Sequence, residues 1–168
     1  MFCLMLSASV MSATTDTIIV SVEIQGEKSI SIDLASLDFG PLALNSLNNV
    51  SATPVIVSNI GNLASTWSIR ISGADPDWAA AAAPGSDQYR LMALFNATGT
   101  TPVTGDFDTT NDLVTTTEVV SSGTKYAGDQ SGLGVLAGAA RSLWFRLDTP
   151  TSSSVSTPRA FTLELEAQ

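Results

Sequence analysis

The acidic stretch of residues 105–112 holds the best candidates for chemistry in this chain. Asp106, Asp108 and Asp112 lie close together there, and Asn111 adds an amide oxygen. Closely spaced carboxylates and carbonyls in a loop suit Ca²⁺, which takes about six to eight oxygen ligands. The stretch lacks the central glycine and final glutamate of an EF-hand, and a turn that bonds its own backbone through Asp and Asn is the alternative. Calcium is the one cofactor that the sequence suggests.

Other catalytic groups are scarce. The chain has no histidine and a single cysteine, Cys3, so it cannot build a Ser-His-Asp site, a Cys-His site or the usual zinc sites of His and Cys. Two further carboxylate pairs could support glycoside hydrolysis, but pairs of this kind are usually solvated surface; they are Asp75 with Asp77 and Glu164 with Glu166. We therefore expect that the protein is not an enzyme.

The charge of the chain excludes one class of partner. Seven basic residues stand against sixteen acidic ones, which gives a net charge of -9. A nucleic-acid backbone would be repelled by such a surface, so we predict that the protein does not bind nucleic acid.

Three aromatic residues are candidates for ligand contact or for packing. Trp144 lies opposite the apolar face of its segment, and Tyr126 lies in a glycine-rich stretch. Both could form an exposed platform for a carbohydrate or a protein, although Trp144 could also pack under a loop. Trp78 is expected to pack over an open end of the fold. Two glycosylation triplets, at Asn49 and Asn96, are weak signals in a chain rich in Ser and Thr.

The first thirteen residues form an apolar run that ends in small residues. This pattern is typical of a secretory signal and favours an extracellular or cell-surface location. The first basic residue is Lys28, so the basic leader of a signal is missing and a segment of another kind is the alternative. The run is too short for a transmembrane helix, which needs about 20 apolar residues.

The rest of the chain must be mainly strands. Short segments alternate apolar and polar residues with a period of two, as half-buried strands do; they cover residues 17–25, 29–34, 55–59, 66–71, 88–95, 113–120, 143–147 and 161–165. We expect residues 55–71 to form one hairpin and residues 141–166 another. One short helix is predicted near 76–83, with Asp75 as its N-cap and Pro84 and Gly85 as its end.

Together these segments predict an all-β protein, an antiparallel two-sheet sandwich of immunoglobulin-like or jelly-roll type. One such domain would occupy residues 14–168, with residues 17–25 as its N-terminal strand.

Four motifs carry a resemblance; they are Leu37-Asp38-Phe39-Gly40, Asn59-Ile60-Gly61-Asn62, Thr66-Trp67-Ser68-Ile69 and Arg141-Ser142-Leu143-Trp144-Phe145-Arg146-Leu147. Together they resemble exported prokaryotic immunoglobulin-like β-sandwich proteins of unknown function. In organisation alone, the chain is similar to secreted fibre subunits of the camelysin type. The resemblance implies fold and export rather than a reaction.

The leading functional hypothesis is an extracellular structural subunit that assembles into a filament or surface layer. Ile18, Val20, Val22 and Ile24 share one face of the N-terminal segment, and this face could complete a sheet of a neighbouring subunit. The alternative for this segment is pairing within its own domain. Partners would then be copies of the chain or other cell-surface proteins. The alternative function is a secreted module that binds carbohydrate or protein.

Overall fold

The computed structural model describes residues 18–168, and within them nearly all regular structure is strand. The elements are β1 (Ile30–Ile32), β2 (Asn49–Val50), β3 (Val55–Asn59), β4 (Trp67–Gly73), β5 (Ala79–Ala80), β6 (Gln88–Asn96), a 3-10 turn (Thr104–Asp106), β7 (Val119–Val120), β8 (Ala140–Asp148) and β9 (Thr162–Ala167). The all-β prediction is confirmed.

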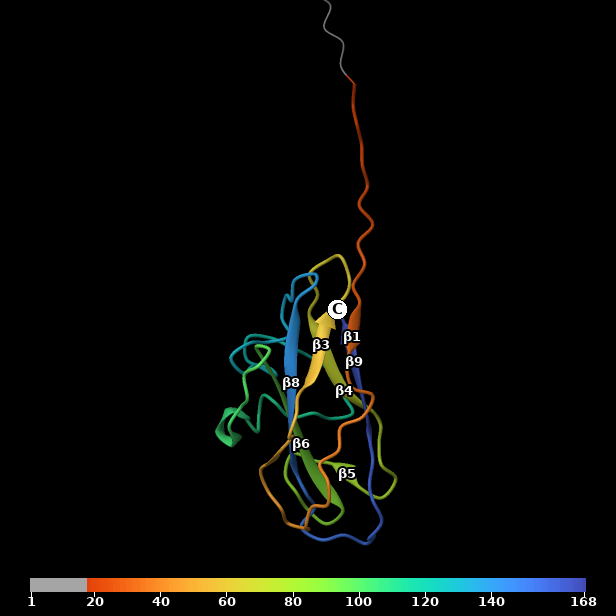
Figure 1. Ribbon diagram of the computed structural model, residues 1–168. Coiled ribbons are helices and arrows are strands. Elements are labelled where there is room, and N and C mark those ends of the chain that lie inside the picture. The colour runs from red at the N-terminus through yellow and green to blue at the C-terminus, as the bar shows by residue number, and fades with distance from the viewer. Residues whose placement is uncertain (1–17) are drawn as a thin grey trace, which may run out of the picture.

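Two sheets form the body (Figure 1). The larger has the order β1-β3-β8-β6-β5, and β2 pairs with the far end of β8. The smaller has the order β7-β4-β9. All pairs are antiparallel except β5 with β6.

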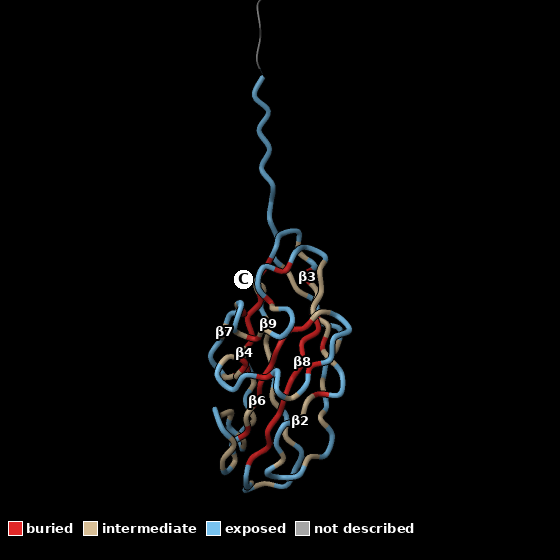
Figure 2. Tube along the Cα trace, turned by 90° about the vertical axis from the view of Figure 1, so that its left-hand side faces the viewer, coloured by how far each residue is buried: buried red, intermediate tan, exposed pale blue. Residues whose placement is uncertain are grey.

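One main hydrophobic core joins the two sheets. Trp67, Ile69 and Ile71 of β4 meet alternate residues of β6 and β8, such as Phe95 and Phe145. Figure 2 shows this buried layer running along β4, β6 and β8. The alternation in the sequence therefore predicted correctly which face of these strands is buried.

A second, smaller cluster lies on the other face of β6 and β8. It consists of Met92, Leu94, Phe107 and Trp144, with Val50 packed against it. The long loop after β6 covers this face, since the indole Nε1 of Trp144 donates to the carbonyl of Thr100 at 3.0 Å. This is why the middle of both strands is buried on both faces.

Neither predicted hairpin forms. β3 and β4 lie in different sheets, and so do β8 and β9. β3 pairs with β8, and β4 pairs with β9. The apolar face of a strand packs against the facing sheet whether the next strand of the chain lies in its own sheet or in the other one, so the alternation did not reveal the crossing.

The helix predicted near 76–83 is wrong. Asp75 does accept hydrogen bonds from the backbone N–H groups of Asp77 and Trp78, at 2.9 and 3.0 Å, as a cap would. Beyond that turn the chain is extended, and β5 pairs in parallel with β6. A run of five alanines between two prolines is too short to nucleate a stable helix, and pairing with a sheet edge takes its place.

The strand expected over 113–120 is also much shorter than predicted. Only Val119–Val120 pairs with β4, as β7. Val114 is fully buried in the main core without belonging to a strand. Its amide instead donates to the carbonyl of Leu91 on β6 at 2.9 Å.

Candidate functional site

Residues 18–25 form an extended segment that leaves the body at the end where the C-terminus also lies (Figure 1). The side chains of Ile18, Val20, Val22 and Ile24 are 81% to 89% exposed, and Figure 2 shows the whole segment as exposed. The prediction of a strand paired within its own domain over 17–25 is therefore wrong for residues 18–25, which belong to no strand. Thr17 and the predicted leader 1–13 lie outside the described residues.

The base of this segment is tied to the connection between β3 and β4. Glu27 donates its backbone N–H to Oδ1 of Asn62 at 2.7 Å, and its carbonyl accepts from the backbone N–H of Asn62 at 3.0 Å. The side-chain amide of Asn62 also donates to the carbonyl of Gln25 at 3.0 Å. We call these three contacts the exit anchor, because they fix the direction in which residues 18–25 leave the body.

The absence of a side chain at Gly61 allows the two segments of the exit anchor to approach each other. A Cβ atom at this position would lie 2.4 Å from the carbonyl oxygen of Glu27 and 2.8 Å from the backbone nitrogen of Ser29. Both neighbours are backbone atoms, which cannot move aside as a flexible side chain can. Only glycine lets the two segments approach this closely.

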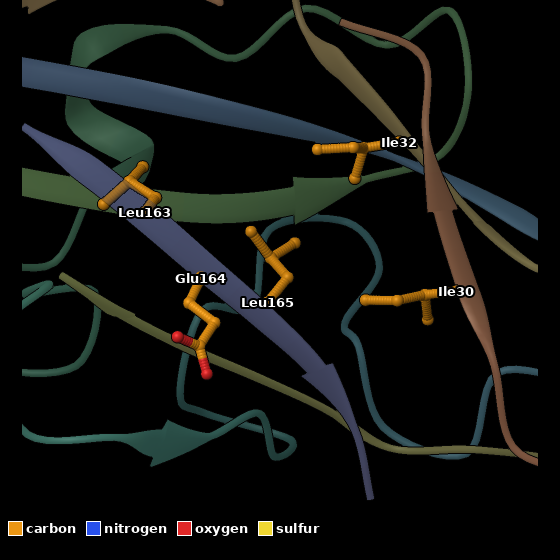
Figure 3. Close-up of a pocket in the computed structure, with 5 residues that line it drawn as sticks. All are labelled: Ile30, Ile32, Leu163, Glu164 and Leu165. Atoms are coloured by element: carbon orange, nitrogen blue, oxygen red, sulfur yellow. The ribbon is translucent and has the colours of Figure 1, made fainter. Parts of the chain in front are cut away.

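A hollow of about 310 Å³ lies beside the exit, between the edges of the two sheets. Ile30 and Ile32 of β1 form one wall, and Leu163 and Leu165 of β9 form the other. Figure 3 shows Ile30 and Ile32 pointing across the hollow toward the β9 side. We call this hollow the β1–β9 groove. Ile32 is 49% exposed in it, so the main core is left open along this edge.

Glu164 lies on β9 between the two leucines and points away from them (Figure 3). It forms an ion pair with Arg70 of β4 at 2.7 Å, on the outer face of the smaller sheet. The hydrogen bond and the negative charge of Glu164 raise the pKa of Arg70. Glu164 thus also lines the hollow, but its carboxylate is held by Arg70, and the other four lining side chains are apolar.

The predicted aromatic platform is wrong. Tyr126 is fully buried in the main core, and its hydroxyl donates to the carbonyl of Leu113 at 3.1 Å. Trp144 is only 5% exposed beneath the loop that follows β6. Trp78 also packs against the main core, and its Nε1 donates to Oγ of Ser153 at 2.9 Å. The burial of Trp144 matches the loop-covered alternative.

The three predicted calcium ligands face their own loop. Asp106 accepts from the backbone N–H of Val103, Asp108 from that of Thr110, and Asp112 from that of Asp108, at 2.7 to 2.8 Å. Among residues 18–168, no group of three or more acidic, His or Cys side chains is close enough together to hold a metal ion. The turn with its own backbone bonds thus describes this loop, and calcium binding stays a prediction.

The pKa values of two of these carboxyl groups are shifted in opposite directions. The backbone N–H of Thr110 and the amide of Asn111 lower the pKa of Asp108. Burial raises the pKa of Asp112 to about 6, against its hydrogen bond from Asp108. Oδ1 of Asp112 is buried and has no hydrogen-bond partner among the described residues.

Both glycosylation triplets have their asparagine amides engaged. The amide of Asn49 donates to the carbonyls of Ser46 and Leu147 at 3.1 and 2.9 Å. Asn96 is buried, and its Oδ1 accepts from the backbone N–H of Asp129 at 3.0 Å. In the folded protein neither side chain is a free acceptor for a glycan.

The sequence marked residues 17–25 as an apolar, strand-forming segment, but it indicated neither the groove nor the exit anchor. Ile30 and Ile32 belong to the predicted segment 29–34, and Leu163 and Leu165 belong to the predicted segment 161–165. Nothing in their spacing indicates that the edges of two sheets leave a gap between them. Gly61 and Asn62 lie in the connection of the hairpin predicted over residues 55–71, and such a connection alone does not show what it contacts.

Comparison of the chain with protein-family models, with curated proteins and with solved structures found no match. Within residues 18–168 no helix has the length and the apolar character needed to cross a membrane.

Proposed function

We propose that the protein is an extracellular structural subunit that assembles with copies of itself through its N-terminal segment. The observation that carries the proposal is the exposure of residues 18–24 outside any strand. A monomer gains nothing from holding four alternating Ile and Val side chains in water.

The composition of the segment supports this role. Burying one Ile or Val side chain contributes about 1.5–3 kcal/mol, and β-branched residues favour strands. An extended chain of this kind adds readily to an exposed sheet edge, where its backbone completes the ladder and its side chains fill a groove. Sheet edges are the usual sites of such pairing.

Other features fit export and an immunoglobulin-like version of the sandwich. The apolar run of residues 1–13 ends in small residues, as secretory signals do. The chain crosses between the two sheets from β3 to β4 and from β8 to β9, as it does in sandwiches of the immunoglobulin type. We propose a cell-surface or extracellular location on the first of these grounds.

A structural role is also favoured over the two alternatives. The chain lacks histidine, and its pair Asp75 and Asp77 is engaged by Arg159. The proposed ligand-binding module loses its two candidate aromatic residues to the interior. Assembly is the function for which the described residues offer an exposed and unpaired element.

Deletion of residues 14–25 tests the proposal. We expect the truncated protein to remain a folded monomer, because the main core is built from residues 30–167, and to form no filaments in negative-stain images. A synthetic peptide of residues 14–25 should bind the truncated protein with 1:1 stoichiometry. A chain that begins at Thr14 is the matched control and should assemble.

Polymers formed by the truncated protein would overturn the proposal. N-terminal sequencing of native extracellular material tests export in the same preparation, because a processed N-terminus near residue 14 is the expected result.

A further inference from the structure

We propose that the acceptor for residues 18–25 is the β1–β9 groove of a second copy, and that the donated segment pairs antiparallel with β9. This inference rests on the proposed assembly and names the surface that it uses. Four steps carry it: the orientation of the backbone at the two edges, the side chains of the groove, the exit anchor and the direction of the strands.

The backbone of β1 offers hydrogen bonds to the groove. The carbonyl of Ser29 accepts from Ile60 at 3.0 Å, and the backbone N–H of Asp33 donates to Ile56 at 3.2 Å, so these residues face β3. In an antiparallel pair, successive residues direct their polar groups to opposite sides. Ile30 and Ile32 therefore direct theirs to the open edge.

The same alternation applies to β9. Gln168 and Thr66 exchange two backbone hydrogen bonds, at 2.7 and 3.2 Å. If this register is continued along β9, the backbone N–H and C=O groups of Glu166 and Glu164 point toward β4. The backbone groups of Leu163 and Leu165 then point toward the open edge. The residues whose side chains line the groove are thus the ones with outward-facing backbone groups.

The side chains of the segment match the groove in spacing and character. Ile18, Val20, Val22 and Ile24 recur every two residues, as Leu163 and Leu165 do, and they would continue the open core. Ser21 and Glu23 would then lie on the outer face of the smaller sheet. The eight residues extend over about 26 Å at about 3.3 Å each, which is enough to cover the six residues of β9.

The exit anchor directs the segment away from the groove of its own chain. Two hydrogen bonds join Glu27 to Asn62, and a third joins Asn62 to Gln25. Together they hold the residues that precede β1 in line with that strand. A return into its own groove would require a reversal within these bonded residues. The segment instead projects past the end of the body (Figure 1), so the partner that it fits is another copy.

The strand directions decide which edge the segment joins. β1 runs away from the exit, whereas β9 runs toward it and ends beside it (Figure 1). In a head-to-tail polymer whose copies point the same way, the donated segment runs parallel to β1 and antiparallel to β9. Antiparallel pairing is the more stable of the two, and it also matches the antiparallel order of the smaller sheet.

This interface is heterologous, because the donor and the acceptor are different surfaces of the chain. Such contacts form open filaments unless a rotation closes them into a ring. The other sheet edges offer much less, since β5 and β7 each have two residues.

Ile32→Lys tests the acceptor in the full-length chain. Ile32 is 49% exposed, so a lysine there can reach water without unfolding the body, yet it places a charge where the donor would lie. We expect loss of filaments and at least a tenfold loss of affinity for a peptide of residues 14–25. Leu44→Lys is the matched control, because Leu44 is 48% exposed and lies outside the groove; it should assemble as the wild type does.

Disulfide trapping tests the strand and its direction. In a Cys3→Ser background, Ser21→Cys is combined with Thr162→Cys or Glu166→Cys on the outer face of β9, or with Ser31→Cys on β1. We expect a ladder of cross-linked chains for at least one of the two β9 pairs. A ladder only with Ser31→Cys, or no ladder from polymers that do form, would overturn the inference.

The outcomes separate the two proposals. If the Ile32→Lys variant assembles normally while deletion of residues 14–25 stops assembly, the acceptor lies elsewhere and only this inference fails. If the deletion leaves assembly intact, the proposed function fails as well.

Discussion

At the scale of single residues, the pKa values of two buried carboxyl groups, those of Asp148 and Asp112, are shifted in opposite directions. Asp148 lies at the end of β8 and has a fully buried side chain, yet it bonds Arg90 at 2.5 Å, Arg146 at 3.3 Å and the backbone N–H of Asn48. Against the effect of burial, these partners lower its pKa. Asp112 has no such cation, and burial raises its pKa to about 6. The partners of Asp148 thus favour its ionised form, whereas the burial of Asp112 favours its protonated form.

The raised pKa of Asp112 predicts that the protein loses stability as the pH rises. The folded state keeps the proton up to about pH 6, whereas the unfolded chain releases it near its ordinary value of 3.8. Between these values the unfolded state binds fewer protons, so the free energy of unfolding falls with rising pH. We expect the wild type to lose about 3 kcal/mol over this window relative to Asp112→Asn, at about 1.4 kcal/mol per pKa unit.

Urea unfolding at a series of pH values measures this difference. Asp106→Asn, at an exposed carboxylate of the same loop, is the control and should follow the wild-type profile. Parallel profiles for the wild type and Asp112→Asn would show that folding does not raise the pKa of Asp112.

At the scale of elements, the connection between β3 and β4 has two tasks. It carries the chain from one sheet to the other, and it holds the base of the exposed segment through Asn62. Asn59 fixes this connection to the body, because its side-chain amide donates to the carbonyls of Leu63 and Val135, both at 2.8 Å. The exit anchor is therefore built on a connection that is itself fixed to the body.

Gly61→Ala should break the exit anchor. The added Cβ would lie 2.4 Å from the carbonyl oxygen of Glu27, and overpacking of this kind costs about 1–3 kcal/mol. We expect the amides of Asn62 and Leu63 to exchange with deuterium about tenfold faster or more, because the local opening free energy falls.

Gly26→Ala provides the control for this exchange measurement. A Cβ at Gly26 would meet the far end of the Leu63 side chain at 2.3 Å, which is 42% exposed and can move aside. Its exchange should stay close to that of the wild type. Equal protection in Gly61→Ala and the wild type would mean that the close approach of the two segments is not needed.

At the scale of the whole molecule, charge would oppose the proposed assembly, whereas the apolar segment would favour it. Every copy carries a net charge of -9, so copies repel one another at long range. Four of the five residues that line the groove are apolar, and the fifth, Glu164, is paired with Arg70. Contact within the groove is thus favourable only after this long-range repulsion has been overcome.

Assembly should therefore become faster as salt is added. We expect the rate of growth in light scattering to rise between about 20 mM and about 300 mM NaCl, because the screening length falls from roughly 20 Å to below 10 Å. The Ile32→Lys variant should show no growth at either concentration. A wild-type rate that falls with salt would indicate that charge attraction, and not the apolar segment, joins the copies.

The sequence alone determined the local properties of this protein. Its period of two identified most of the strands and the inward faces of β4, β6, β8 and β9, and it marked residues 18–24 as a strand-forming stretch. These properties follow from the chain's own geometry, since neighbouring side chains of any extended segment point to opposite sides. For the same reason the alternation showed which side chains are apolar and favour burial, but not which segments bury them.

The tertiary structure alone decided which strands pair and what is left open. The crossings from β3 to β4 and from β8 to β9, the burial of Tyr126 and Trp144, and the β1–β9 groove all depend on segments far apart in the chain. An apolar face gains the same free energy against any apolar partner, so the pattern of one segment does not select among them. That selection is made only when all segments compete for one core, and it leaves this edge of the core open.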